Sequence, residues 1–116
     1  MADVIVLFEV KPTKEGMQRY LDLAAMLKPM LAVFEGFFRA ERFTSLNEEG
    51  KLLSMNVWTD EAAVERWRNV TKHRMSQKEG REKLFESYKI TVCRSIREYS
   101  DTEREQAPED SNAYFG

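Results

Sequence analysis

Residues 52–58 alternate between two kinds of side chain, and this pattern constrains the fold more than any other feature of the sequence. The positions Leu53, Met55 and Val57 are all apolar, whereas the positions between them combine polar groups with Leu52 and Trp58. A period of two places the two sets on opposite faces of a β-strand. We therefore expect a strand with one wholly apolar face and one mixed face.

A second alternating segment, residues 37–45, precedes this strand and predicts a hairpin. The connection 47–50 reads Asn-Glu-Glu-Gly, and its glycine can adopt the positive φ that tight hairpin turns require. We expect residues 37–45 and 51–58 to pair antiparallel.

Two further strands flank this hairpin in the sequence. Residues 4–10 read VIVLFEV, a β-branched and aromatic run that is apolar on nearly both faces, which predicts a central strand. Residues 88–99 alternate again and predict the last strand. The sheet is thus expected to have four strands.

Apolar residues recur at helical spacing in the two long segments that connect the predicted strands, which predicts helices there. The first helix is expected to begin near Thr13, and Pro29 should kink or end it, because proline lacks the backbone N–H that a helix interior uses. A short helix after the third strand is expected to stop at Asn69, and another to run from Thr71 to about Ser87.

The order β-α-β-β-α-(α)-β predicts a ferredoxin-like α+β fold, in which a four-stranded antiparallel sheet carries helices on one face. Helices can cover only that face, and the other would expose more apolar surface than monomers usually tolerate. We therefore expect a homodimer of the dimeric α+β barrel type, with two sheets packed face to face.

Chain length and composition bound the function. A chain of 116 residues is the size of one domain; we assign residues 1–100 to it and residues 101–116, which are polar and acidic, to a tail. The 18 basic and 20 acidic residues are interleaved, which argues against nucleic-acid binding. The absence of a long apolar run and of a signal peptide, together with the single cysteine Cys93, predicts a cytoplasmic protein without membrane contact.

Cofactor and metal motifs are missing from the sequence. One histidine and one cysteine cannot assemble the usual metal ligand sets, so no metal site is expected. No glycine-rich phosphate loop or dinucleotide fingerprint is present. An oxidising enzyme with this sequence would have to take its electrons from its own substrate.

The stretch LLSMNVWTDEAAVERWRN, followed by KHRMSQKEGREKLFESYKITV, closely resembles the antibiotic biosynthesis monooxygenase family. The resemblance spans roughly Val4 to Tyr99 and implies a small dimeric α+β barrel. Characterised members of that family include cofactor-independent oxygenases that act on phenols or quinols and relatives that bind and degrade heme, while many members have no assigned role. The resemblance thus implies a monooxygenase, an oxidoreductase of a small phenolic, quinol or polyketide-like aromatic substrate.

Trp58 occupies the position in which ring-oxidising relatives carry a pocket tryptophan. Those relatives have an asparagine four residues earlier; here that position is Ser54, and Asn56 lies two residues before the tryptophan on the same face. An indole N–H and a carboxamide can donate hydrogen bonds to a phenolate or to a reduced-oxygen intermediate. The alternative is a core tryptophan with Asn56 bonded locally.

His73 is the only histidine and the natural base for removing a phenolic proton near neutral pH. On a helix it would share a stripe with Gln77 and Tyr88. The alternative is a solvated helix residue beside two cations. The expected catalytic residues are therefore His73, Trp58 and Asn56, and the expected substrate-binding residues are Ser54, Trp67, Gln77 and Tyr88, although Trp67 also suits a core position.

Heme is the second hypothesis, with His73 as the axial ligand. Heme-degrading relatives place a histidine ten residues after a helix tryptophan and an asparagine on the first strand. Here the residue ten positions after Trp67 is Gln77, and the first strand offers Phe8 and Glu9. The residues therefore argue against heme degradation, and a non-catalytic ligand-binding or stress-response module is the third hypothesis.

Overall fold

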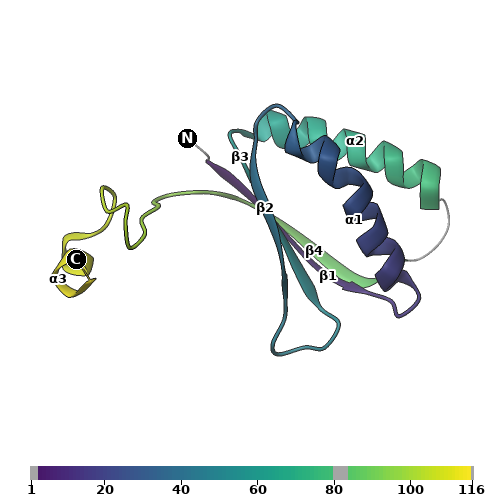
Figure 1. Cartoon of the computed structure of the whole chain (residues 1–116), viewed down its shortest axis with the longest axis horizontal. Helices are drawn as coiled ribbons and strands as arrows, with labels where there is room; N and C mark the ends of the chain where they lie inside the picture. The colour runs from purple at the N-terminus through teal and green to yellow at the C-terminus, as the bar shows by residue number, and fades with distance from the viewer. Residues whose placement is uncertain (1–2, 80–83, 116) are drawn as a thin grey trace.

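The computed structural model describes residues 3–79 and 84–115, with the side chains of 73–79 and 113–115 outside that description. Four strands and three helices make up the described chain (Figure 1): β1 (Val4–Pro12), α1 (Gly16–Ala32), β2 (Phe37–Thr44), β3 (Leu52–Trp58), α2 (Glu61–Glu79), β4 (Phe85–Arg94) and α3 (Glu109–Phe115).

The four strands form one sheet in the order β2-β3-β1-β4, and every neighbouring pair is antiparallel. Figure 1 shows α1 and α2 together on one side of this sheet. The predicted ferredoxin-like α+β fold is confirmed. No described helix combines the length and the apolar character needed to cross a membrane.

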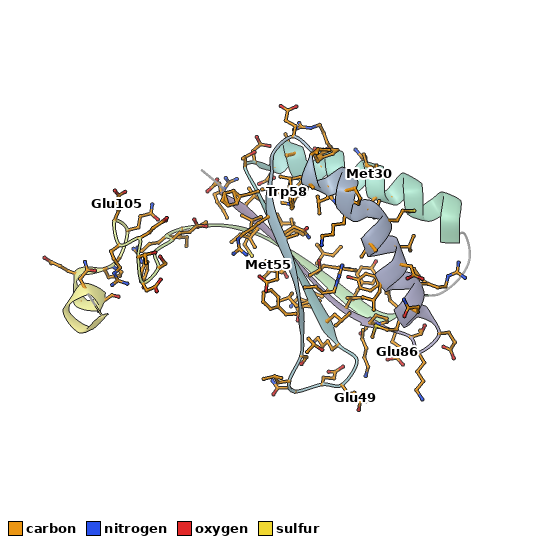
Figure 2. All side chains as sticks on the ribbon, viewed as in Figure 1. Met30, Glu49, Met55, Trp58, Glu86 and Glu105 are labelled. Carbon is orange, nitrogen blue, oxygen red and sulfur yellow. The ribbon has the colours of Figure 1, made fainter. Side chains whose placement is uncertain are left out.

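The core identifies which side of β3 faces the helices. Trp58 is packed with Val4 of β1 and with Ala63 of α2, so the mixed side of the strand lies under the helices. The apolar side points the other way, as Figure 2 shows for Met55. We call this second side of the sheet the open face; its apolar residues are Ile5, Leu7, Phe43, Leu53, Met55 and Val57.

Pro29 does not end α1, which continues to Ala32. The expectation that it ends the helix was wrong because the proline lies one turn from the end, on the exposed side, where it removes a single hydrogen bond. Directly after the helix, the Phe34 backbone N–H donates a 3.0 Å hydrogen bond to the Leu31 carbonyl.

Asn69 does not stop a helix either, because a single helix, α2, runs from Glu61 to Glu79. Asp60 caps its beginning, accepting a 2.8 Å hydrogen bond from the Ala63 backbone N–H. Thr71 caps nothing: its hydroxyl donates to the Arg68 carbonyl within the helix, at 3.0 Å. Asparagine inside a helix costs only about 0.7 kcal/mol, which the packing of the helix overrides.

The last strand also differs from its predicted bounds. It begins at Phe85, where a helix was expected, because the Phe85 ring packs against those of Phe8 and Tyr20. It ends at Arg94 rather than at residue 99. Its partner β1 starts at Val4, so beyond that point the chain has no strand to pair with.

Gly36 allows β2 and α2 to approach each other closely. Its φ is +91°, and a Cβ at this position would lie 2.4 Å from the Cβ of Ala63. The Gly36 carbonyl also accepts a 2.8 Å hydrogen bond from Thr59 N–H at the end of β3. One glycine thus fixes where β2, β3 and α2 meet.

We expect Gly36→Ala to lower the free energy of unfolding by about 3 kcal/mol or more, because it adds a clash in the core to the strain of a left-handed backbone. Gly50→Ala is the matched control, since Gly50 has a φ of +82° but open space around it. The control should cost only about 1 kcal/mol. Urea denaturation measures both, and equal losses would contradict the clash.

Candidate functional site

The polar groups of the mixed side of β3 lie between the sheet and the helices. In the sheet register Asn56 is flanked by Ala40 of β2 and Val6 of β1. Ser54, one row further along, is flanked by Arg42 and Phe8. We call the Ser54 hydroxyl, the Asn56 carboxamide and the Trp58 indole N–H the β3 donors.

Trp58 is the anchor of this region and is only 1 % exposed. Its ring centroid lies 6.1 Å from that of Phe34, 5.5 Å from that of Phe37 and 6.3 Å from that of Trp67. Trp67 also contacts Phe34 edge-on at 5.1 Å. Trp67 is therefore packed into the same aromatic cluster, as its core alternative supposed.

The β3 donors have unused hydrogen-bonding capacity. Among the described residues, none makes a hydrogen bond to the indole N–H of Trp58, the carboxamide of Asn56 or the hydroxyl of Ser54. A buried donor without a partner costs about 1–3 kcal/mol, so such groups in native proteins call for an explanation. The Trp58 N–H is such a buried donor, whereas Asn56 and Ser54 are half-buried. The three groups stand at successive same-face positions of one strand.

An apolar strip leads from these donors to the edge of the sheet. Val6 and Phe8 of β1 are paired with Val92 and Ile90 of β4, and Tyr88 follows on the same side. The exposed fractions of Tyr88, Ile90 and Val92 are 62 %, 55 % and 51 %. The strip offers a flat apolar surface on which an aromatic ring could rest.

Sequence reasoning did not select Arg42, which lies in the same row as Ser54. Its guanidinium carbon is 5.5 Å from the centre of the Tyr20 ring on α1, a cation–π contact. The alternation of β2 could have identified it, since Arg42 and Ala40 share the side that faces the helices. Arg42 is thus a cation paired in the sheet register with Ser54, one of the β3 donors.

The structure brings four of the seven expected residues into one region: Ser54, Asn56, Trp58 and Trp67. Tyr88 lies at the far edge of the apolar strip, where its ring is 5.9 Å from that of Phe8. His73 and Gln77 both fall within α2, but their side chains lie outside the described residues. Their roles stay predictions.

Charged groups elsewhere do not add to this region. At the other end of β1 the Lys11 amine is 3.3 Å from the Glu48 carboxylate and 3.7 Å from that of Glu86. The hydrogen bond and charge of Glu48, with those of Glu86, raise the pKa of Lys11 above its ordinary value. Lys11 therefore stays protonated and cannot act as a base.

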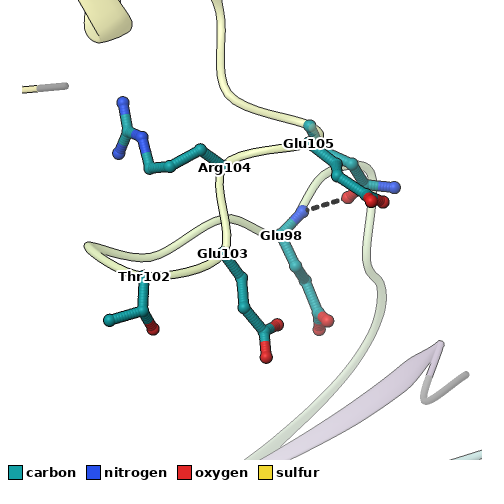
Figure 3. Close-up of a pocket in the computed structure, with 6 residues that line it drawn as sticks. Glu98, Thr102, Glu103, Arg104 and Glu105 are labelled. Atoms are coloured by element: carbon teal, nitrogen blue, oxygen red, sulfur yellow. Dashed lines mark hydrogen bonds between the residues drawn. The ribbon is translucent and has the colours of Figure 1, made fainter.

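A hollow of about 390 Å³ lies away from the β3 donors, in the segment after β4 (Figure 3). Its lining is polar and largely acidic, with Glu98, Glu103 and Glu105 beside Arg104. It lacks the apolar walls that bind an aromatic molecule. Among the described residues, no three His, Cys, Asp or Glu side chains gather closely enough to hold a metal ion.

Comparison with known proteins identifies the family. Residues 3–79 match the antibiotic biosynthesis monooxygenase family. The chain belongs to this family. The expected resemblance is therefore confirmed.

Three relatives illustrate the range of the antibiotic biosynthesis monooxygenase fold. Jasmonate monooxygenase ABM of Pyricularia oryzae is 38 % identical over 87 residues; the match covers 75 % of this chain but only 40 % of that protein. SnoaB of Streptomyces nogalater, a cofactor-independent oxygenase, superposes with a TM-score of 0.64 at 13 % identity, covering 83 % of this chain and 95 % of SnoaB. MhuD, solved with two manganese protoporphyrin IX molecules per active site, gives a TM-score of 0.66 at 9 % identity over 84 % and 98 % of the two chains.

We expect Asn56→Leu to change the free energy of unfolding by no more than about 1 kcal/mol, because no described hydrogen bond is lost. Trp58→Ala, which empties the centre of the aromatic cluster, should cost about 3–5 kcal/mol. Urea denaturation of both variants tests the contrast. A loss of more than about 2 kcal/mol for Asn56→Leu would mean that the carboxamide supports the fold instead of standing ready for a ligand.

Proposed function

We propose that this domain is a cofactor-independent monooxygenase that oxidises a small phenolic or quinol substrate lying between the sheet and its helices. The observation that carries the proposal is the set of β3 donors without partners among the described residues, beside an apolar strip. Membership of the antibiotic biosynthesis monooxygenase family supports it. The cofactor-independent oxygenase SnoaB has the same fold, which supports chemistry without a bound cofactor.

The reaction balances without an external reductant. A phenol loses its proton to a base, and the electron-rich ring carbon of the phenolate reduces dioxygen and bonds to one of its atoms. The resulting hydroperoxide loses water to give the quinone. One oxygen atom enters the ring, the other leaves as water, and the substrate supplies all four electrons.

The donors of β3 fit the charge that develops in this reaction. The Trp58 N–H and the Asn56 carboxamide would donate hydrogen bonds to the phenolate oxygen or to the reduced oxygen, as preorganised donors do in an oxyanion hole. Burial strengthens such bonds because the local dielectric is low. Ser54 and the apolar strip over Phe8 and Ile90 would hold the ring in place.

His73 is the proposed base, on the chemical ground that it alone titrates near neutral pH without help. Its helix, α2, is the element that contributes Ala63 and Trp67 to the cluster around Trp58. Neighbouring carboxylates would need a large pKa shift to perform the same task.

Heme fits this site poorly. On the side of β1 that faces the helices stand Val6 and Phe8, without a polar side chain. The Phe8 ring is already packed against Tyr20 and Phe85, at 6.3 and 5.8 Å. We therefore assign no step to heme, and a Soret band appearing on titration with hemin would contradict this assignment.

The first test separates the indole N–H from its ring. Trp58→Phe keeps an aromatic ring in the core but removes the donor, and we expect it to lower kcat by about 10²-fold or more. Phe34→Leu is the control, since it perturbs the same cluster without removing a polar group. Oxygen consumption with a panel of naphthols, hydroquinones and jasmonate gives the rates.

The outcomes of this screen separate the substrate classes. Jasmonate has no phenol group to reduce dioxygen, so its monooxygenation would need an added two-electron reductant. Turnover of jasmonate alone would therefore overturn both the phenolic substrate and the chemistry without an external reductant, and keep only the oxygenase. Equal kcat losses in Trp58→Phe and Phe34→Leu would show that packing, not the N–H, limits the reaction.

The second test concerns the base. His73→Ala should lower kcat by about 10²-fold and remove the acidic limb of the pH–rate profile, since positioned proton transfer contributes about that much. Glu65→Ala, an exposed change on the same helix, is the control. Full activity of the His73 variant would remove the histidine from the mechanism and leave the β3 donors.

A further inference from the structure

Arg42 is a charged residue on the side of the sheet that the helices cover, and the function proposed above does not use it. It belongs to β2 and is paired with Ser54 of β3 in the sheet register. The residue as a whole is exposed, but its guanidinium carbon lies 5.5 Å from the centre of the Tyr20 ring, and Tyr20 is only 8 % exposed. A buried ring of α1 therefore holds the guanidinium in place through a cation–π contact.

Four residues around this position are neighbours of one another. Arg42 lies over Tyr20, and the Tyr20 ring is 6.3 Å from that of Phe8. Phe8 is paired in the sheet with Ser54, and Ser54 is paired with Arg42. One row of the sheet thus combines a guanidinium and a hydroxyl with two aromatic rings. Polar groups beside an apolar wall are the usual composition of a surface that binds a small molecule.

Arg42 lacks a carboxylate partner among the residues that the structure describes, where it forms neither an ion pair nor a hydrogen bond. The acidic residues closest to it in the two flanking rows, Glu41 of β2 and Glu9 of β1, occupy open-face positions. Arg94, by contrast, is paired with two carboxylates of its own chain. The N–H donors of the Arg42 guanidinium are therefore available to an anion from solution.

The row of Arg42 and Ser54 lies at a defined spacing from the other β3 donors. Residues two apart on one face of a strand are separated by roughly 7 Å. The row is one such step from Asn56 and two from Trp58. Asn56 and Trp58 are the residues proposed above to hold the reacting oxygen. The site thus has donors for that oxygen at one end and a fixed cation at the other.

We propose that Arg42 selects substrates whose aromatic ring system carries a carboxylate roughly 7 Å from the reacting hydroxyl. This inference rests on the function proposed above and narrows its substrate class to ionised aromatic carboxylic acids that also bear a phenol or hydroquinone. The planar guanidinium would bind both carboxylate oxygens through parallel N–H bonds, and the Ser54 hydroxyl would donate to one of them. The carboxylate takes no part in the oxidation, so the balance of oxygen atoms and electrons is unchanged.

The test compares 5-hydroxy-2-naphthoate with its primary amide, 5-hydroxy-2-naphthamide. The two molecules share the naphthol and differ in charge, and each carries its carboxyl group on the ring remote from the hydroxyl. Isothermal titration calorimetry of the full chain without dioxygen gives both dissociation constants. The acid should bind about 10-fold more tightly or better, because hydrogen bonds between two charged groups are stronger than those to a neutral amide.

Variants of two arginines on the same strand locate the preference. Arg42→Gln should reduce it to about 2-fold or less, whereas Arg39→Gln, the same change at an open-face position of β2, should leave it intact. Arg42→Lys keeps the charge but not the planar fork, so it should retain only part of the preference. The comparison of acid and amide on the unaltered chain keeps the proposal testable if a variant does not fold.

An acid that binds no more tightly than the amide, or equal preferences in Arg42→Gln and Arg39→Gln, would overturn the proposal. Oxygen consumption with the same two naphthols separates this failure from that of the proposed function. Arg42-dependent binding of the acid without oxygen uptake from either naphthol would keep the carboxylate site and contradict the oxygenase. Oxygen uptake from both naphthols, with equal dissociation constants, would contradict the carboxylate site and keep the oxygenase.

Discussion

Packing of the Trp58 indole is the interaction on which the rest of the structure depends. The ring is held by Phe34 from the turn before β2, by Phe37 at the start of β2 and by Trp67 from α2, so one side chain joins three separate parts of the chain. Gly36 makes this possible, because any larger residue there would press on Ala63. The helix layer therefore meets the sheet at the end of β3.

The same side chain links stability to chemistry. A tryptophan buried for its apolar surface brings a polar N–H into the core, and no described group satisfies that donor. Natural proteins break the rule of satisfied buried groups mainly where a function requires it. Asn56 and Ser54 are half-buried and also lack a described partner, and the proposed ligand site accounts for all three positions together.

The two sides of the sheet differ in their side chains and in how they are covered. The side under the helices combines a closed aromatic cluster around Trp58 with an apolar strip on β4, and the exposed fraction of the side chains rises from the cluster to the strip. The open face combines apolar side chains such as Ile5, Leu7 and Met55 with the charged residues Glu9, Arg39 and Glu41. Its apolar side chains would gain from being covered, as in sheets that pack face to face.

Side-chain alternation and one apolar run predicted the four strands, and the resemblance of longer stretches predicted the family. Both signals are properties of neighbouring residues, which the sequence states directly. It could not determine how far the elements run. Whether Pro29 or Asn69 ends a helix depends on packing and on position within the helix, and the end of β4 depends on where β1 begins. The preference of Asn69 against the helix is less than about 1 kcal/mol and yields to such contacts. Pro29 costs more in a helix interior and is accommodated in the last turn of α1.

The tertiary structure alone decided which side of β3 the helices cover, and hence that Trp58 is buried while its N–H stays without a partner among the described residues. It also placed Arg42 beside Ser54. Residues 96–115 extend away from the sheet and its helices. These facts rest on contacts between residues far apart in the chain, such as Val4 with Trp58 and Gly36 with Ala63. A pattern of period two predicts that a strand has two faces. Which face is buried is decided only by the strands and helices that pack on it, and these come from distant parts of the sequence.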